Sequence, residues 1–178
     1  MSETTITPDI YNPDGIDARG MGTVVLIPAV AGDAPTTAEI NAGIIISCAL
    51  YNFGTTREQG MNSYAKYCDT DNRQSAGRTT WGVTPLIVDD DPQRVDTSGQ
   101  YDYLDQIVEG QRYWLWDVRG IKAKEYTPTV GERGDLHPIR IEGWRRLDID
   151  PTAEADKLRR EYTVTHLGDP NMDVEVTA

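Results

Sequence analysis

The stretch that decides the fold is QRYWLWDVR, from Gln111 to Arg119, whose centre is an unbroken aromatic and aliphatic run. Aromatic and branched residues favour extended backbone, and a short apolar run of this length is consistent with a buried strand. Such a run is buried on both faces or forms an interface on one of them. Because side chains alternate, Trp114 and Trp116 share one face and Leu115 points to the other. We therefore predict a strand in the core of a mainly β protein.

Further segments rich in β-branched and aromatic residues lie on both sides of this strand, with turn-forming residues between them. They have the length of strands, and they occupy residues 23–30, 44–51, 78–88, 136–142, 144–149, 161–166 and 172–176. Many short strands in one chain favour an antiparallel β-sandwich or barrel.

Helical patterns are few. The spacing of Tyr101, Leu104, Ile107 and Val108 predicts the only sizeable helix, between residues 98 and 109. The sequence TTAE, residues 36–39, has the form of a capping box and predicts one short helical turn. The expected architecture is thus a β-sandwich or barrel with one flanking α-helix.

Two segments are polar and lack an apolar period. Residues 1–19 are rich in Asp, Thr and Pro and are predicted to form an N-terminal arm. Residues 52–77 are predicted to form an extended loop, which is unusually long for a plain connection and should therefore have a function. The remainder, residues 20–178, is predicted to be a single β-domain.

The chain is acidic, with 29 Asp and Glu against 17 Lys and Arg and a formal net charge of −12. No basic cluster is available to grip phosphates, so a DNA-binding role is disfavoured. The N-terminus lacks the pattern of a secretory signal, and no apolar run is long enough to span a bilayer. We expect a protein made in the cytoplasm.

Candidate catalytic and metal-binding groups are sparse. His137 and His166 are the only histidines, and neither lies near a nucleophile motif. The run from Asp69 to Arg73 resembles a calcium loop only in part, because Arg73 stands at a ligand position. The two cysteines have neither metal-site spacing nor the density of a disulfide framework, so we expect reduced thiols. We predict no catalytic residue, cofactor or metal, and no enzyme.

The order of several short motifs resembles the major tail tube proteins of siphophages, especially those of actinobacterial phages. These motifs are RGMGTV at 19–24, TTAEINAG at 36–43, TTW at 79–81, DDPQ at 90–93 and YWLWDVRG at 113–120. The resemblance implies a β-sandwich related to the tube protein of type VI secretion. It also implies hexameric rings that stack into the virion tail tube, through which DNA passes without specific binding during ejection. The implied partners are further copies of the chain, the tape measure protein, and tail terminator and tip proteins.

In that family, the long loop after the second strand reaches the next ring, and residues 52–77 hold that position here. The candidate inter-ring residues are Arg57, Glu58, Tyr64, Lys66, Tyr67, Asp69, Asp71 and Arg73. The candidate core or interface residues are Trp81, Trp114, Leu115, Trp116 and Trp144.

An acidic wall suits a DNA channel, because carboxylates repel phosphates. The candidate lumen-facing acids are Glu142, Asp148 and Asp150, which lie in or beside segments that alternate polar and apolar residues. The alternative is that the two aspartates pair with Arg145 and Arg146 on the outer surface. At the level of the whole protein, the alternatives are a head-tail joining or tail terminator protein that forms a single ring, and a monomeric ligand-binding β-domain.

Overall fold

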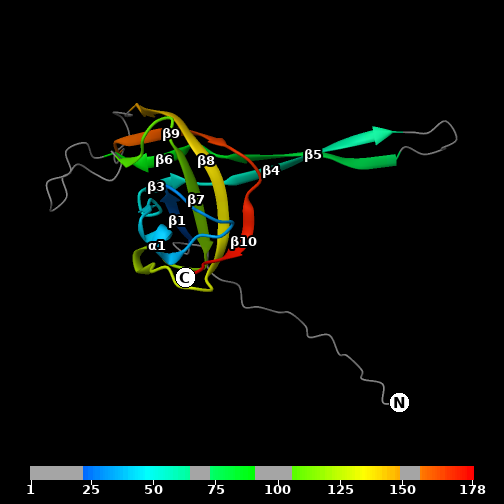
Figure 1. Cartoon of the computed structure of the whole chain (residues 1–178). Helices are drawn as coiled ribbons and strands as arrows, with labels where there is room; N and C mark the ends of the chain where they lie inside the picture. The colour runs from blue at the N-terminus through cyan, green and yellow to red at the C-terminus, as the bar shows by residue number, and fades with distance from the viewer. Residues whose placement is uncertain (1–21, 65–72, 91–105, 149–156) are drawn as a thin grey trace, which may run out of the picture.

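Strand β7 (Arg112–Arg119) is an interior strand of the main sheet in the computed structural model, which describes residues 22–64, 73–90, 106–148 and 157–178. Seven strands follow one another in the order β2-β1-β7-β8-β9-β6-β3, and β10 pairs with β8. The ladders between these strands are antiparallel, and the sheet curls around itself (Figure 1). The mainly β, antiparallel fold predicted from the sequence is confirmed. The other strands of the sheet are β1 (Gly22–Ile27), β2 (Ile44–Ile45), β3 (Leu50–Asn52), β6 (Leu86–Asp89), β8 (Arg133–Arg146), β9 (Arg159–His166) and β10 (Asn171–Glu175).

Strand β7 is buried on both faces, as its sequence indicated. Leu115 has no exposed surface and belongs to the cluster inside the curl of the sheet, with side chains from β1, β6, β8 and β9. Trp116 is also fully buried and belongs to a second cluster on the opposite face, which includes Ile40 and Val176. The curled sheet therefore has one apolar cluster inside it and a second beneath the segments that cover its outer face.

The one α-helix in the described part of the chain is α1 (Thr37–Asn41). The predicted capping box is present: the Glu39 amide donates to Thr36 Oγ1 at 3.1 Å, and the Thr36 amide donates to Glu39 Oε2 at 2.8 Å. Hydrogen bonds to the Glu39 carboxyl lower its pKa, the bond from the Thr36 amide most of all and then the bond from the Ala31 amide. The helix predicted at 98–109 lies largely outside the described residues, and residues 107–109 are not helical. A 3-10 turn, η2 (Ala123–Glu125), follows β7.

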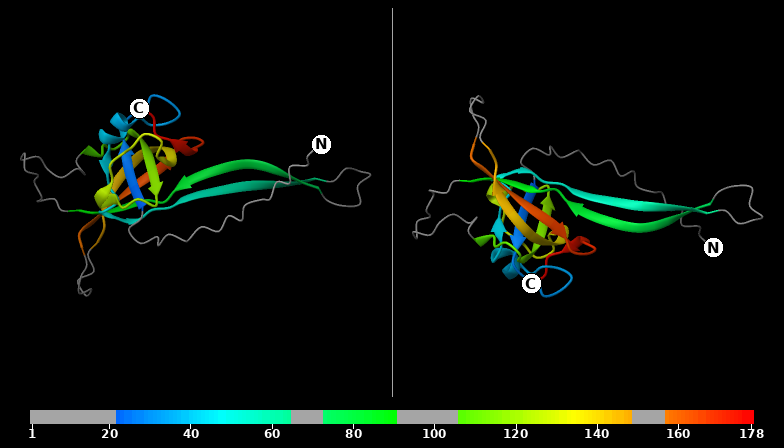
Figure 2. Two further views of the ribbon diagram at one scale, coloured as in Figure 1. Left: turned by 90° about the horizontal axis from the view of Figure 1, so that it is seen from below. Right: turned by 90° about the horizontal axis from the view of Figure 1, so that it is seen from above.

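The polar stretch predicted as a loop is instead a two-stranded antiparallel ribbon of β4 (Thr55–Tyr64) and β5 (Arg73–Val83). The ribbon projects well beyond the body of the protein in every view (Figures 1 and 2). The loop prediction failed because these strands are held by backbone pairing and not by burial, so their sequence carries no apolar alternation.

Three further strand predictions need correction. Residues 78–88 do not form one strand, because they divide between the end of β5 at Val83 and β6, which begins at Leu86. Residues 44–51 do not form one strand, because a turn closed by the Ala49 amide on the Ile46 carbonyl, at 3.0 Å, separates β2 from β3. Residues 136–149 do not form two strands, because β8 continues through Gly143 with a register shift against β9. In the described residues, no helix has the length and apolar character needed to cross a membrane.

Candidate assembly surface

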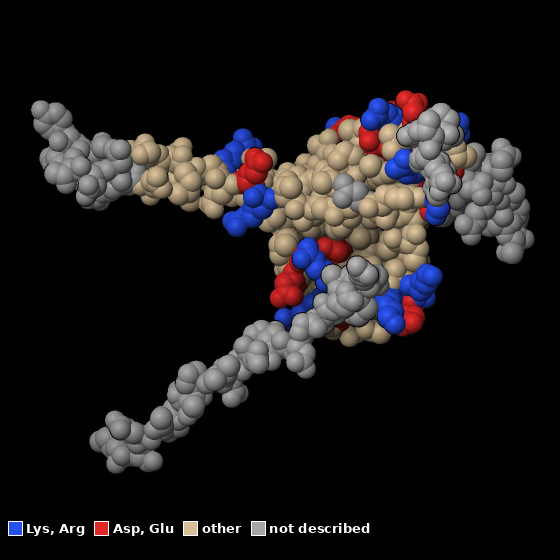
Figure 3. Space-filling view, turned by 180° about the vertical axis from the view of Figure 1, so that it is seen from behind, with Lys and Arg blue, Asp and Glu red and all other residues tan. Residues whose placement is uncertain are grey.

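The ribbon carries no charge between its root and Arg73, the first residue of β5. From Gln59 to Tyr64 and from Gln74 to Gly77 every residue is uncharged, whereas Lys, Arg, Asp and Glu gather near the root of the ribbon (Figure 3). Met61 is 61 % exposed and Tyr64 is 47 % exposed. A long, exposed ribbon with an uncharged middle part is a poor surface for a monomer in water and a suitable one for contact with other subunits.

Both outer edges of the ribbon lack a strand partner among the described residues, because β4 and β5 form a separate two-stranded sheet. Unpaired amide and carbonyl groups along such an edge form a template for pairing with another chain. The ten residues of β4 span roughly 33 Å at the usual rise of a strand. The ribbon therefore offers a neighbouring subunit two long backbone edges.

A pair of glycines sets the local geometry of the ribbon. The register shifts between Gln59 and Met61, and Gly60 lies close to Gly77 across the two strands. A Cβ on Gly77 would come within 2.8 Å of the Gly60 carbonyl oxygen. Such a register shift is a bulge, which bends and twists a ribbon locally, and only glycine fits at this approach.

The ribbon is attached to the body through Trp81, which lies opposite Arg57 in the register of β4 and β5. The Arg57 guanidinium lies 5.5 Å from the centre of the Trp81 ring. The other contact of Trp81 is with His166 at the end of β9, with ring centroids 6.5 Å apart and nearly parallel planes. Trp81 thus connects the ribbon to the sheet. Glu58, the next residue after Arg57 on β4, lies opposite Thr80.

His166 in turn contacts His137 on β8, with 3.3 Å between His166 Nε2 and His137 Nδ1. His137 has no exposed surface, and its Nε2 has no hydrogen-bond partner among the described residues. Burial, and then the charge of His166, lower the pKa of His137 to about 4, and burial also lowers the pKa of His166. Both rings are therefore neutral at pH 7. This pair was not predicted from the sequence, because the two residues are 29 positions apart.

A hollow of about 1010 Å³ lies at this junction, and we call it the root hollow. It is lined by Arg57, by residues 78–81 of β5 and by residues 166–170, which lead from β9 to β10. Its lining includes two guanidinium groups, an indole, an imidazole and the carboxylate of Asp169.

At the far end of β9, charged side chains are paired within the body. Asp90 is 5 % exposed and accepts hydrogen bonds from Arg160 Nη2 at 3.0 Å and from Arg146 Nε at 3.2 Å. The Trp144 ring lies 4.3 Å from the Arg160 guanidinium and is itself 44 % exposed. This network gives Asp90 a structural role just beyond the end of β6.

The predicted lumen acids lie in different surroundings. Glu142 on β8 pairs with Arg140 at 2.7 Å, and hydrogen bonds from Arg140 and Thr165 lower its pKa. Asp148 is exposed just beyond β8, and Asp150 lies outside the described residues. Asp148 forms no ion pair with Arg145 or Arg146, although its charge is one of those that raise the pKa of Arg145. Those two arginines pair instead with Glu161 at 2.9 Å and with Asp90.

The remaining predicted residues are dispersed. Of the candidate core or interface residues, Leu115 and Trp116 are buried in the core, whereas Trp81 and Trp114 are half-buried. Of the predicted inter-ring set, Arg57, Glu58 and Tyr64 are exposed on β4. Lys66, Tyr67, Asp69 and Asp71 lie outside the described residues, and Arg73 is described only as the first residue of β5.

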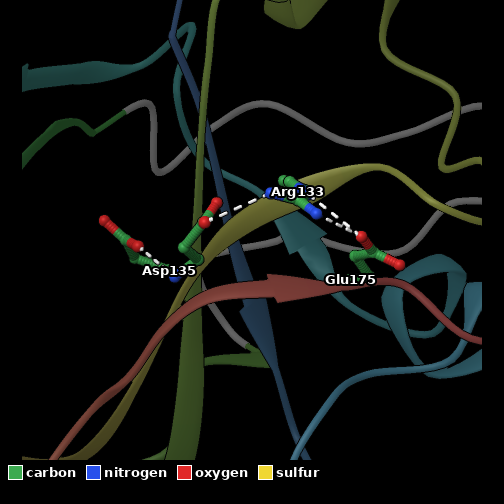
Figure 4. Close-up of polar contacts among 4 residues, drawn as sticks. Arg133, Asp135 and Glu175 are labelled. Atoms are coloured by element: carbon green, nitrogen blue, oxygen red, sulfur yellow. Dashed lines mark hydrogen bonds and ion pairs between the residues drawn. The ribbon is translucent and has the colours of Figure 1, made fainter. Parts of the chain in front are cut away.

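The last strand, β10, is fastened to β8 by charge (Figure 4). Arg133 donates to Glu175 Oε1 at 3.0 Å and to Asp173 Oδ2 at 3.4 Å, and the Asp173 amide donates to Asp135 Oδ1 at 2.9 Å. Asp173 has a φ of 52°, a conformation that aspartate tolerates better than most residues, and it lies where the register between β10 and β8 shifts. These contacts hold β10 next to the outer apolar cluster.

A family model described as phage tail tube protein matches residues 11–178 of the chain. The comparison with curated proteins found no significant match.

Proposed function

Because the chain belongs to the phage tail tube protein family and is therefore a structural component of the virion tail, we propose that it polymerises as stacked hexameric rings into a siphophage tail tube. The observation that carries this proposal is the ribbon of β4 and β5. It projects from the body with two unpaired edges among the described residues, which an isolated subunit does not need.

In the proposed tube, the ribbon of each subunit reaches the next ring, as the inter-ring segment of the family does. Arg57, Glu58 and Tyr64 then contribute from the described part of β4. Pairing along the ribbon edges supplies backbone hydrogen bonds, and the exposed Met61 and Tyr64 supply apolar contact. The same fold therefore serves as the wall of one ring and as the connector to another.

The tube conducts phage DNA during ejection without binding it specifically. Six-fold repetition multiplies every inward carboxylate into a ring of charge, and Glu142, Asp148 and Asp150 are the proposed lumen acids. Because Glu142 is paired with Arg140, the two aspartates contribute most of the repulsion in this scheme. The tape measure protein and the tail terminator and tip proteins are the proposed partners, and synthesis takes place in the host cytoplasm.

Electron microscopy of the purified chain over a range of concentrations tests this proposal. Tubes of stacked six-fold rings are the expected product at high concentration. Single closed rings that never stack would contradict the tube, and monomers at every concentration, with or without preformed tail tips as nuclei, would contradict polymerisation altogether.

A further inference from the structure

The negative charge of the chain is distributed unevenly. The described residues hold 16 Asp and Glu against 14 Lys and Arg, so their net charge is only −2 of the total of −12. The remaining −10 belongs to segments outside the described residues. One of them, IDPTAEAD at 149–156, has three carboxylates and no Lys or Arg among eight residues. The body is thus nearly neutral, and it has concentrated acidic segments attached to it.

The arginines of the body differ in a way that complements this distribution. Six of them form an ion pair with a carboxylate, namely Arg119, Arg133, Arg140, Arg145, Arg146 and Arg160. Arg57 and Arg78 in the root hollow form none with the described carboxylates, although Asp169 lines the same hollow. They lie beside Trp81, and arginine and tryptophan are the residue types most enriched in binding hot spots. The root hollow is therefore suited to an acidic polypeptide segment.

The topology places the acidic segment and the hollow at opposite ends of the same strands. The ribbon ends at Val83, and strand β6 begins three residues later. The other end of β6 is Asp89, which pairs with Arg159 at the start of β9. Segment 149–156 enters β9 at that start, whereas His166 at the end of β9 lines the hollow. The ribbon and the beginning of β9 accordingly lie on opposite sides of the body (Figure 1).

We propose that the root hollow of one copy receives the acidic segment 149–156 of a second copy. The inference rests on the proposed function, because it supplies a head-to-tail contact of the kind that generates rings or filaments. Arg57 and Arg78 pair with the carboxylates of Glu154 and Asp156. Trp81 gives the segment an apolar surface, and Asp169, the one carboxylate among the described residues that line the hollow, opposes the contact.

Charge reversal on each side tests the contact. One variant carries Arg57→Glu and Arg78→Glu, and the other carries Glu154→Lys and Asp156→Lys. Each alone should require about tenfold more protein, or more, to assemble, measured by sedimentation and electron microscopy at low ionic strength. Mixed in equal amounts, the two variants should assemble again, because each reversed hollow then meets a reversed segment and each native hollow a native one.

The matched control reverses Asp102 and Asp105 to Lys, which changes the charge by the same amount in another acidic segment. It should leave assembly unchanged, and Asp169→Asn should lower the concentration needed for assembly. If both reversal variants assemble like the native chain, or if their mixture does not regain assembly although both are folded by thermal unfolding, the contact is wrong. The proposed function itself fails only if the native chain does not assemble.

Discussion

Trp116 is one of the fully enclosed residues of the outer apolar cluster. It has no exposed surface, and its indole Nε1 donates to the Tyr126 hydroxyl at 3.0 Å. Burial and the nearby Glu132 carboxylate raise the pKa of Tyr126 above its usual range, so the hydroxyl remains protonated. The core of this sheet therefore depends on one aromatic pair as well as on aliphatic packing.

Replacing Trp116 with Ala is expected to lower the free energy of unfolding by about 3–5 kcal/mol, because a large cavity forms and the Tyr126 hydroxyl loses its partner. Leu115→Ala, on the opposite face, is expected to cost about 2–5 kcal/mol. Urea unfolding of the monomer measures both. Val130→Ala, at a side chain that is 64 % exposed, serves as the control and should change little. A loss below about 1 kcal/mol for either core variant would contradict its assigned burial.

His137 gives the fold a dependence on pH whose sign follows from its surroundings. Its pKa is about 4 in the folded protein and 6.5 for the free side chain, so between these values the unfolded chain binds more protons. Stability is therefore complete above about pH 6.5 and decreases as the pH falls towards 4, by up to about 3 kcal/mol. The lowered pKa of His166 acts in the same direction.

The variant His137→Leu should lose most of this dependence, because it places an uncharged side chain of similar size in the same buried position. Thermal unfolding of both proteins between pH 4 and 7 provides the measurement. Acidification also removes the stability that is contributed by carboxyls with lowered pKa values, such as Glu39. That loss is the same in both proteins, so the difference between their slopes isolates the contribution of His137. Equal slopes for the two proteins would rule out this role for His137.

At the scale of elements, the ribbon is separable from the body. It contacts the sheet near its root through Trp81 and His166, and neither of the two apolar clusters contains a residue from its outer part. Its stability comes from cross-strand pairing, and its sequence can change without removing a core side chain.

Replacing Gly60–Gly77 with Asn-Gly, a sequence that favours a tight hairpin turn, should therefore leave a folded monomer that cannot stack. The expected melting temperature is within a few degrees of that of the native chain, while tubes disappear from electron micrographs. Gly77→Ala is the milder variant, since its Cβ approaches the Gly60 carbonyl oxygen, and Ser75→Ala at an exposed position is its control. Long tubes formed by the shortened chain would show that the ribbon does not connect rings.

The elements differ in how far the sequence revealed them. Strand β7 and the capping box of α1 were predictable because each has a strong local signal: an apolar run in one case and Thr36 with Glu39 in the other. The ribbon was missed because pairing replaces burial in its strands. The contacts of the candidate surface were predictable least of all, because His137, His166 and Trp81 meet through long-range pairing that one sequence does not display.

At the scale of the whole molecule, the question is which surface faces the lumen of the proposed tube. The described body is nearly neutral and its arginines are mostly paired, so its field near the wall is weak. Asp148 is exposed and has no ion pair among the described residues, and it stands two positions before Asp150. In a six-fold ring these two positions supply twelve negative charges, which only a lumen placement would bring close to DNA.

Replacing both aspartates with Lys changes twelve negative charges into twelve positive ones in each ring of the proposed tube. Assembly should survive at moderate salt, because the Asp148 side chain faces water and contributes little packing energy. Ejection should become slower or stop, since cationic rings attract the phosphates that pass them, and the effect should weaken as salt shortens the screening length from about 10 Å at 0.1 M. The measurement is the rate of DNA release from variant particles at low and high ionic strength.

Arg145→Glu with Glu161→Arg, which reverses an ion pair without changing the net charge, is the matched control. Ejection at the native rate in both salts would place Asp148 and Asp150 away from the channel and would leave the tube itself untouched. Because Asp150 also belongs to the segment proposed to enter the root hollow, Asp148→Lys alone separates the two roles: only a lumen placement predicts slower ejection with unchanged assembly.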